Sequence, residues 1–367
     1  MTALTSRPGP LPPITDLSLT ALGEMLQGRG ERAFRSAQIA GWLYRSKADS
    51  FAAMHNVPKS LREALATQYA FSAAVPVAQR VSADERTIKA VLRLRDGALI
   101  ESVLMRYDRR RDGTGRQRAT VCVSSQVGCP LRCSFCATGL MGLARNLTAA
   151  EMVDQVLHFL RWSRHHPPVV RNVVFMGMGE PCLNLDSCME AVDRLCDPLG
   201  ACLAAPRITI STVGWVPGIE RLARESWPVR LAVSLHAPNN DLRDQLVPLN
   251  RRYPLDALLA SCRAYQQQTG RRVTIEYTLM DGVNDSAPLA RELIRVLHGL
   301  DCHINLIPMN PVADLPYEPS PQPAVAAFHA ILRAGGLVAT VRQQMGRDIR
   351  GACGQLQTEV SSPKAGQ

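Results

Sequence analysis

The feature that most constrains the fold of this chain is an alternation of β-type and helical runs between residues 118 and 342. The first helix is marked by Thr148 and Glu151, which make a T-x-x-E capping box. Strands that alternate with helices favour right-handed crossovers and a parallel sheet. About six such units are too few for an eight-stranded barrel, so we predict an α/β fold, an open, partial (β/α)6 barrel. The β-type runs are 119–124, 172–176, 208–213, 229–235, 273–280 and 303–308, with 337–342 as a closing strand.

Three cysteines stand in one short loop, Cys129, Cys133 and Cys136 in the run VGCPLRCSFCATG. The spacing C-x3-C-x2-C presents three thiolates, enough for three corners of a cubane iron-sulfur cluster, whereas a fourth cysteine would close the fourth corner. An open coordination position distinguishes a catalytic metal centre from a structural one. The natural occupant of the open iron is S-adenosylmethionine (SAM), whose amino and carboxylate groups can chelate it. The alternatives are a zinc site that lacks one ligand, or three small core residues.

Composition and charge agree with an enzyme from a reducing compartment. The 367 residues include eleven cysteines, and the sequence has neither a signal-peptide pattern at its start nor an apolar run of membrane-spanning length. We therefore expect a cytoplasmic protein with no membrane partner. The net charge of +10 comes from arginine, since only four of the 42 basic residues are lysines. Arginine excess suits contact with nucleic acid, and it suits an arginine-biased soluble surface equally well.

The N-terminal part predicts a small accessory domain over residues 15–106. A flexible tail is expected at 1–14, followed by helical patterns and then a β-hairpin. The hairpin turns at Asp96-Gly97, a dipeptide typical of a type I′ turn. On its second strand Glu101 shares a face with apolar residues, so it must be paired, exposed at an edge, or held for proton chemistry with a raised pKa. The sequence pattern alone favours an exposed position of Glu101 at a sheet edge. The expected hairpin strands are 87–94 and 98–105.

A basic loop is expected at 107–118, between the accessory domain and the barrel at 119–356. Five arginines and two glycines cannot bury a core, so this loop either contacts phosphates or forms a solvated tip. A flexible C-terminal tail is expected at 357–367. The arginines of the loop are Arg109, Arg110, Arg111, Arg116 and Arg118.

Polar residues and glycines follow the β-type runs at the point where each run ends. Because the carboxyl ends of parallel strands meet at one rim, we expect these residues to form a ligand site there. A buried Ser or His at a strand end is more often a structural group, so the joint position carries the argument rather than any single residue. The expected ligand-binding residues are Gly179, Glu180, Ser211, Ser234, Leu235, His236 and Asn310.

Several motifs together resemble the RlmN family of dual-specificity RNA adenine-C2 methyltransferases, within the radical SAM superfamily. They are CVSSQVGC, CSFCATG, VVFMGMGEP, ISTVG, LAVSLHAPN, IPMNP and GRDIRGACGQL. The chain departs from the family pattern at Cys182, where an aliphatic residue is common, and in its long arginine-rich loop. The resemblance implies a radical SAM barrel with a [4Fe-4S] cluster on Cys129, Cys133 and Cys136. It also implies two SAM molecules per turnover.

The resemblance also implies the roles of three further residues. One SAM methylates Cys353, and a second yields a 5′-deoxyadenosyl radical that takes hydrogen from the S-methyl group. The methylene radical then adds to carbon 2 of adenine. Cys122 releases the product by attacking the Cys353 sulfur, forming a transient disulfide. Glu101 matches the general base position, and whether it or Cys122 removes the carbon 2 proton stays open.

The implied substrates are an adenosine near the peptidyl transferase centre of 23S rRNA and the adenosine beside the anticodon in certain tRNAs. An electron donor such as flavodoxin or ferredoxin is also implied, and we expect a monomer. Two alternatives remain. One is a Cfr-type methyltransferase, which uses the same cysteines on carbon 8 of the same rRNA adenosine. The other is a non-catalytic RNA-binding protein with a structural metal, which leaves Cys353 unexplained.

Overall fold

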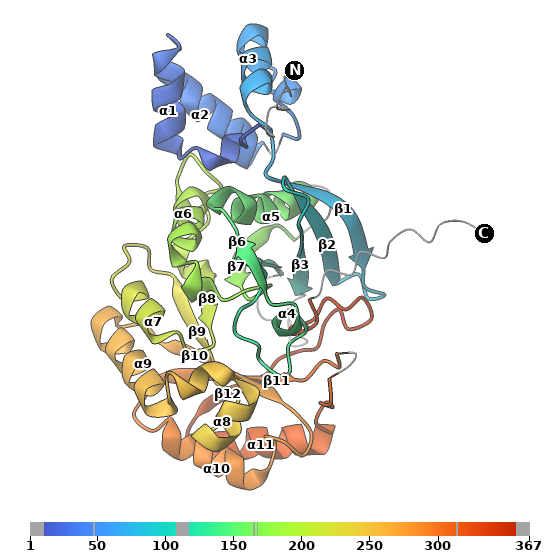
Figure 1. Ribbon diagram of the computed structural model, residues 1–367, viewed down its shortest axis with the longest axis vertical. Helices are drawn as coiled ribbons and strands as arrows, with labels where there is room; N and C mark the ends of the chain where they lie inside the picture. Colours follow the sequence, from blue (N-terminus) through green and yellow to red (C-terminus); the bar gives the residue numbers. More distant parts are fainter. Residues whose placement is uncertain are drawn as a thin grey trace, which may run out of the picture.

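The computed structural model describes residues 11–46, 48–107, 117–163, 166, 168–312 and 315–356 of the chain. Its centre is a ten-stranded mixed sheet with strand order β1-β2-β3-β4-β7-β8-β9-β10-β11-β12 (Figure 1). Two short strands, β5 (Gln126–Gly128) and β6 (Leu143–Asn146), form a separate antiparallel pair. The strands of the large sheet are β1 (Ala74–Val81), β2 (Thr87–Leu94), β3 (Leu99–Tyr107), β4 (Arg118–Cys122), β7 (Val170–Phe175), β8 (Ile208–Thr212), β9 (Arg230–Ser234), β10 (Val273–Leu279), β11 (Cys302–Pro308) and β12 (Val338–Val341).

The part of the sheet from β4 to β12 is the predicted barrel. Each pair of neighbours in this part is parallel, so these strands all end at the same rim. They correspond to the six expected β-type runs and the closing strand. Among the described strands β12 pairs only with β11, so the sheet is open at this side. The expectation of an open, partial (β/α)6 barrel is confirmed.

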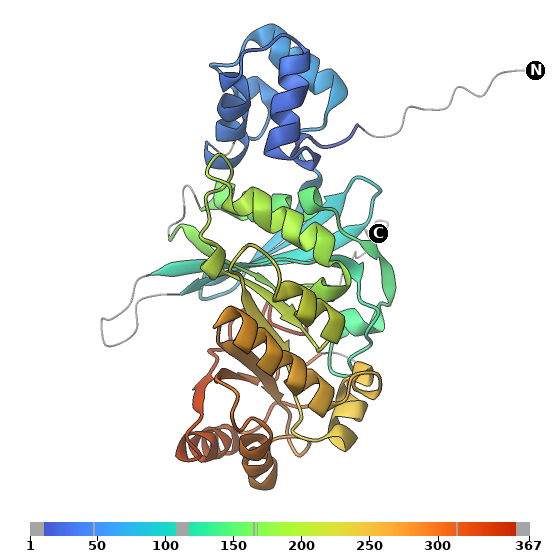
Figure 2. The ribbon, with the colours of Figure 1, turned by 90° about the vertical axis from the view of Figure 1, so that its left-hand side faces the viewer.

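Helices between the parallel strands cover the outer face of the sheet (Figure 2). The capping box that opens α5 is present, since Thr148 Oγ1 accepts from the N–H of Glu151 and Glu151 Oε2 accepts from the N–H of Thr148. Capping satisfies N–H groups that the first turn leaves without partners. These helices are α5 (Ala149–Trp162), α6 (Leu185–Cys196), α7 (Val216–Leu222), α9 (Leu255–Thr269), α10 (Ala287–Val296) and α11 (Gln322–Ala334). Two short helices, α4 (Ala137–Leu140) and α8 (Asn240–Leu246), lie instead beside the cluster loop.

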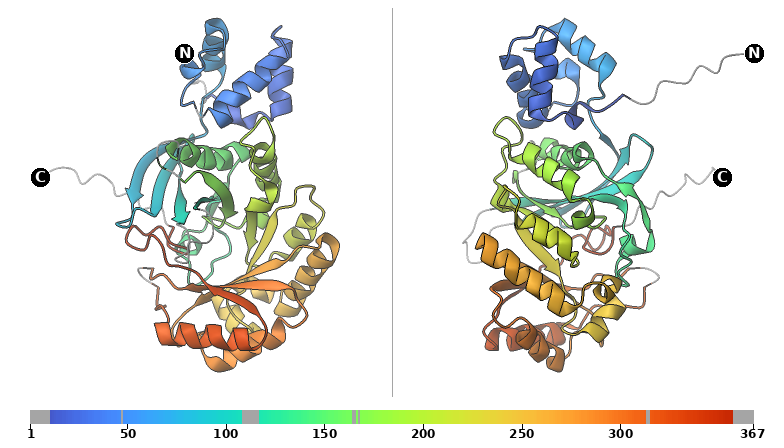
Figure 3. Two further views of the ribbon diagram at one scale, coloured as in Figure 1. Left: turned by 180° about the vertical axis from the view of Figure 1, so that it is seen from behind. Right: turned by 60° about the vertical axis from the view of Figure 1, so that its left-hand side comes forward.

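Three accessory helices stand at one end of the molecule (Figure 3): α1 (Leu19–Gly28), α2 (Phe34–Ala40) and α3 (Lys59–Gln68). Polar contacts join this end to the barrel. The Arg194 guanidinium on α6 donates to the carbonyls of Thr15 (2.6 Å) and Asp16 (3.0 Å). The Asp154 carboxylate on α5 accepts from the N–H groups of Ala73 and Ala74, at the start of β1. Both contacts satisfy buried backbone groups, as burial requires.

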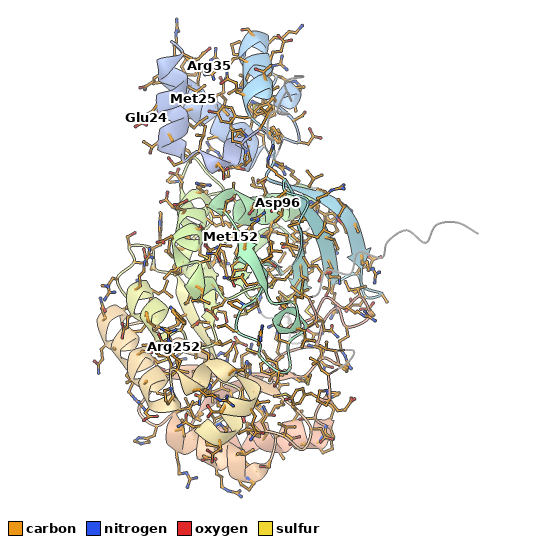
Figure 4. All side chains as sticks on the ribbon, in the orientation of Figure 1. Glu24, Met25, Arg35, Asp96, Met152 and Arg252 are labelled. Atoms are coloured by element: carbon orange, nitrogen blue, oxygen red, sulfur yellow. The ribbon has the colours of Figure 1, made fainter. Side chains whose placement is uncertain are left out.

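The β-hairpin of β2 and β3 is present, but it differs from the expectation in two ways. Its turn contains three residues, and only Gly97 has a positive φ (87°), which fits a type I turn with a bulge rather than a type I′ turn. Figure 4 labels Asp96 at this turn, where its carboxylate accepts from the Ala98 N–H at 3.0 Å. The edge position expected for Glu101 is wrong. An additional strand, β1, covers the far side of β2, and β3 pairs with β4, so β3 lies inside the sheet.

The hairpin therefore belongs to the same hydrogen-bonded sheet as the barrel strands, and the domain boundary expected at residue 106 stays a prediction. Most of the expected basic loop lies outside the described residues, as do most of the N-terminal tail and the whole C-terminal tail. Within the described ranges no helix is both long enough and apolar enough to cross a membrane.

Candidate active site

The carboxyl ends of the parallel strands surround one cavity, which most of the predicted site residues line. The cluster cysteines reach it from the loop after β4, and Cys353 reaches it from the segment after β12. Three of the predicted site residues, Glu101, Cys122 and Leu235, are not among the described residues that line this cavity. The predicted residues that line it are Cys129, Cys133, Cys136, Gly179, Glu180, Ser211, Ser234, His236, Asn310 and Cys353.

The loop that carries the cluster cysteines depends on a close approach between two glycines. Gly128 has φ +78°, and a Cβ atom there would lie 1.8 Å from the Gly142 carbonyl oxygen. That same carbonyl accepts from the Cys129 N–H at 2.8 Å. Further along the loop, the Ser134 N–H donates to the carbonyl of Leu246 at the end of α8 (3.0 Å). The loop is therefore held from two sides by backbone hydrogen bonds.

Burial disfavours the thiolate form of all three cysteines in this loop. It raises the pKa of Cys129 to about 12, and the nearby Cys136 thiol adds to the shift. It also raises the pKa of Cys133 well above its ordinary value, with further contributions from Cys136 and Cys129. All three cysteines line the same cavity. Within the described residues no set of three His, Cys, Asp or Glu side chains converges on the position of a single metal ion.

These residues fit a bound cluster and SAM. Thiols that raise one another's pKa in a buried loop become thiolates only when a metal compensates their charge, as in iron-sulfur sites. Asn310 offers a second observation, because its buried Oδ1 has no hydrogen-bond partner among the described atoms although it belongs to the cavity lining. A buried polar atom of this kind needs a donor, and the SAM ammonium is one.

Glu180 is held by the backbone at the rim. It is 2% exposed, and its Oε1 and Oε2 accept from the N–H groups of Cys182 and Val213, both at 3.0 Å. Burial raises its pKa, and these hydrogen bonds oppose the rise. A ligand amine can still bind, because each carboxylate oxygen accepts more than one hydrogen bond.

His236 has one defined tautomer. Its Nδ1 accepts from the Thr278 N–H at 3.0 Å, so the ring proton of the neutral imidazole is on Nε2. Burial, with the nearby Arg243 guanidinium, lowers the pKa of His236 to about 3. The residue also has a positive φ of 61°, which residues other than glycine rarely adopt. A neutral ring in an unusual backbone conformation points to a ligand-binding role.

Leu235 lies beneath the rim rather than on it. Its side chain is 0% exposed, its N–H donates to the Glu276 carbonyl (3.0 Å), and its carbonyl accepts from Arg243 Nε (3.0 Å). Its role toward SAM stays a prediction.

Cys353 and Cys122 lie close enough for their side chains to interact electrostatically. The Ala137 N–H donates to the Gly354 carbonyl (2.9 Å), and Asn310 Nδ2 donates to the Cys353 carbonyl (3.4 Å), which anchors the C-terminal loop. Burial, and then the nearby Cys353 thiol, raise the pKa of Cys122 to about 12. Both cysteines are free thiols in the structure, so the transient disulfide stays a prediction.

Two charged residues of the cavity lining were missed by sequence reasoning. Arg342 follows β12, and Cys353 first, then Tyr107, Glu276 and Cys122, raise its pKa in spite of burial. Glu276 on β10 is 4% exposed and accepts from Asn305 Nδ2 at 2.7 Å. The sequence held one signal, because a carboxylate inside the apolar run VTIEYTL is unusual for a buried parallel strand. No local sequence pattern indicated that Arg342 would belong to the site.

Comparison with known proteins identifies the family. Residues 123–293 match the model of the radical SAM superfamily, and residues 13–70 match that of the ribosomal RNA large subunit methyltransferase N-terminal domain. A probable dual-specificity RNA methyltransferase RlmN of Pelotomaculum thermopropionicum is 44% identical over 349 residues, covering 95% of this chain and 92% of that protein. The chain belongs to the RlmN family. A probable dual-specificity RNA methyltransferase RlmN of Thermus thermophilus is 43% identical over 353 residues, covering 96% of this chain and 95% of that protein.

A solved structure agrees with this assignment. The radical SAM methyltransferase of Sphaerobacter thermophilus superposes with a TM-score of 0.91 at 50% identity, covering 95% of this chain and all of that one. The chain is therefore a SAM-dependent RNA methyltransferase whose cofactors are a [4Fe-4S] cluster and SAM. The family assignment does not favour the carbon-8 alternative, and it excludes a non-catalytic protein.

Proposed function

We propose that this RlmN-family enzyme methylates carbon 2 of adenosine in 23S rRNA and of the adenosine beside the anticodon in tRNA, with Cys353 as the carrier of the one-carbon unit. The observation that supports this most directly is the position of Cys353. It lines the cavity together with the cluster cysteines, and Cys122 lies within electrostatic range of its sulfur. From this position Cys353 can receive a methyl group within the cavity, and Cys122 can then release the product from the Cys353 sulfur.

The chemistry requires a carrier because carbon 2 of adenine is an electrophilic carbon, which cannot attack the methyl group of SAM. When bound, the cluster and SAM supply the methyl group and the radical reactivity. In the proposed arrangement Cys129, Cys133 and Cys136 hold the cluster, while Gly179, Glu180, Ser211, Ser234, Leu235, His236 and Asn310 surround SAM. Of these, His236 offers a permanently neutral Nε2–H donor and Asn310 an unpaired Oδ1 acceptor.

Cys122 resolves the bond between Cys353 and the product. As the Cys122 sulfur bonds to the Cys353 sulfur, the bond from that sulfur to the one-carbon unit breaks, and its electron pair leaves with the carbon, which takes a proton. The result is a disulfide that a cellular thiol reduces. Burial raises the pKa of Cys122, so the thiol is protonated before the attack, and this proton can pass to the released carbon. Glu101 is the proposed base for the carbon 2 proton.

The proposed partners follow from this chemistry. The enzyme acts as a monomer in the cytoplasm, takes electrons from a flavodoxin or ferredoxin, and binds RNA through basic surface. The target base must leave its stack to reach the cavity, at a cost of a few kcal/mol that RNA binding offsets. The carbon-8 reaction of Cfr-type enzymes is disfavoured, since the relatives reported above are RlmN proteins.

Nucleoside analysis of rRNA and tRNA from a deletion strain tests the product. Loss of 2-methyladenosine from both RNAs supports the proposal, loss from one RNA limits it to that substrate, and loss of 8-methyladenosine contradicts it.

A Cys122→Ala variant tests the carrier. It should methylate Cys353 and then hold the RNA covalently, which a denaturing gel detects. Cys188→Ala is the matched control, because Cys188 is a fully buried thiol on α6 away from the cavity lining. Normal turnover by Cys122→Ala would remove Cys122 from the mechanism.

A further inference from the structure

An ion pair is buried inside the sheet beside Cys122. Lys89 Nζ on β2 lies 2.9 Å from Glu101 Oε1 on β3, and the two side chains are 7% and 2% exposed. Lys89 pairs with Val103 across the antiparallel strands, and Glu101 precedes Val103 by two residues, so the ion pair is diagonal. Side chains two residues apart on a strand share a face, and a lysine is long enough to reach its diagonal neighbour.

The same face carries Cys122. Val103 pairs with Cys122 on β4 as well as with Lys89 on β2, which puts Lys89, Val103 and Cys122 in one row across three strands. Backbone contacts join the same strands, since the Ser124 hydroxyl donates to the Glu101 carbonyl and the Ser102 hydroxyl donates to the Cys122 carbonyl (2.7 Å). The carboxylate therefore stands one residue row away from the proposed resolving cysteine.

Stability is a weak explanation for this pair. Two charges removed from water lose hydration that their attraction only partly returns, and apolar replacements of similar volume are often as stable or more stable. Apolar neighbours are already present on this face at Val103 and Met105. What the pair does provide is an ionised carboxylate inside the protein, because an unpaired carboxyl buried to this degree favours its protonated form.

We propose that Lys89 is a positioning residue that keeps Glu101 ionised and oriented, so that Glu101 can accept the carbon 2 proton. In that step the bond between carbon 2 and hydrogen breaks, the proton passes to Glu101, and the electron pair of the bond stays in the purine ring. The unpaired electron left by the radical addition must pass to a one-electron acceptor, a role that the oxidised [4Fe-4S] cluster would supply when bound. The proposal rests on the function proposed above. It also favours Glu101 over Cys122 as the base, because Glu101 forms an ion pair with Lys89, whereas Cys122 is a buried thiol.

The test is a double-mutant cycle on the reconstituted enzyme, with Lys89→Met, Glu101→Gln and the double variant. Single-turnover methylation of an RNA oligonucleotide gives the rate, and a denaturing gel gives the fraction of RNA held covalently on the protein. Loss of a general base costs roughly 10²-fold or more in rate. We expect this loss in each single variant, together with accumulation of the covalent adduct. Because the double variant carries no buried charge in this pair, its folding does not depend on an unpaired ion.

If Lys89 acts through Glu101, the double variant should be no slower than Glu101→Gln alone. Independent structural roles would instead multiply the two losses. Lys89→Arg, which keeps the charge, should recover most of the rate, and Lys59→Met, an exposed lysine on α3, should have no effect. A wild-type rate in Lys89→Met, or multiplied losses in the double variant, would overturn the inference. A wild-type rate in Glu101→Gln would instead refute the proposed base.

Discussion

His236 accepts a hydrogen bond at Nδ1 from the backbone N–H of Thr278 on β10, at 3.0 Å. This hydrogen bond connects the carboxyl end of β9 to the neighbouring strand β10. It leaves the Nε2–H of His236 as the group that can donate to a ligand. The Phe135 ring of the cluster loop packs against the imidazole edge-on, with centroids 4.7 Å apart. One residue thus connects the cluster loop with two strand ends.

His236→Asn should fold and bind SAM about tenfold more weakly, as the loss of one net hydrogen bond predicts. Asparagine tolerates the positive φ of this position, whereas leucine does not, so His236→Leu should also lower stability by roughly 1–2 kcal/mol. Titration calorimetry on the reconstituted protein measures SAM affinity, with the exposed His298→Asn as control. Because the pKa of His236 is about 3, its charge should not alter SAM affinity between pH 5 and 8. Unchanged SAM affinity in His236→Leu would remove His236 from the site.

Gly128→Ala should prevent the cluster loop from closing. The added Cβ would lie 1.8 Å from the Gly142 carbonyl oxygen, a separation that forces the β5–β6 pair apart and moves Cys129. Iron and sulfide content after anaerobic reconstitution should fall well below that of the wild type. Gly28→Ala at the end of α1 is the control, since its Cβ would meet no atom within 4 Å. Full cluster content in Gly128→Ala would show that the loop relaxes freely.

Arg243→Lys should loosen the rim although it keeps the positive charge. The buried guanidinium donates to the carbonyls of Val213, Ser234 and Leu235 and to Asn250 Oδ1, which joins the ends of β8 and β9 to α8. An ammonium cannot reproduce this fork, and hydrogen bonds to charged groups contribute about 1.5–3 kcal/mol each. We expect a loss on the order of 3 kcal/mol in urea unfolding. The exposed Arg291→Lys on α10 should change nothing measurable, and equal stability of the two variants would refute this account.

Asp154 should make the stability of the protein depend on pH. Burial raises the pKa of Asp154 from its ordinary 3.8 to about 6, against the opposing effects of Arg161 and of the N–H groups of residues 73 and 74. The folded state therefore holds a proton that the unfolded state releases between about pH 4 and pH 6. The stability that this proton contributes is complete below pH 4 and is lost as the pH rises through about 6.

The shift corresponds to a contribution on the order of 3 kcal/mol. Asp154→Asn should remove this dependence, because its amide oxygen can still accept from the residue 73 N–H. Urea unfolding of wild type and variant at several pH values measures the difference, with the exposed Asp281→Asn as control. A difference that does not grow between pH 4 and pH 6 would contradict the raised pKa.

The sequence by itself determined the barrel and much of the site, since local patterns are enough for both. Periodic apolar runs fix strands and helices, and parallel strands bring whatever follows them to one rim. For this reason the meeting of Cys129, Cys133, Cys136 and the rim residues could be predicted from their positions along the chain. The capping box of Thr148 and Glu151 was equally readable, because both partners lie within one helical turn.

Only the tertiary structure decided how side chains meet across strands. The environment of Glu101 depends on β1, whose mixed run with a proline at position 76 gave no clear strand signal, and on a register that puts Lys89 diagonally opposite. Arg342 interacts electrostatically with Cys353, Cys122 and Glu276 because β12 closes the parallel series beside β11, and no spacing in the sequence encodes that arrangement. Strand register and strand order arise from the packing of the whole sheet. The spacing of the three cluster cysteines, in contrast, is fixed by the covalent chain within one short loop.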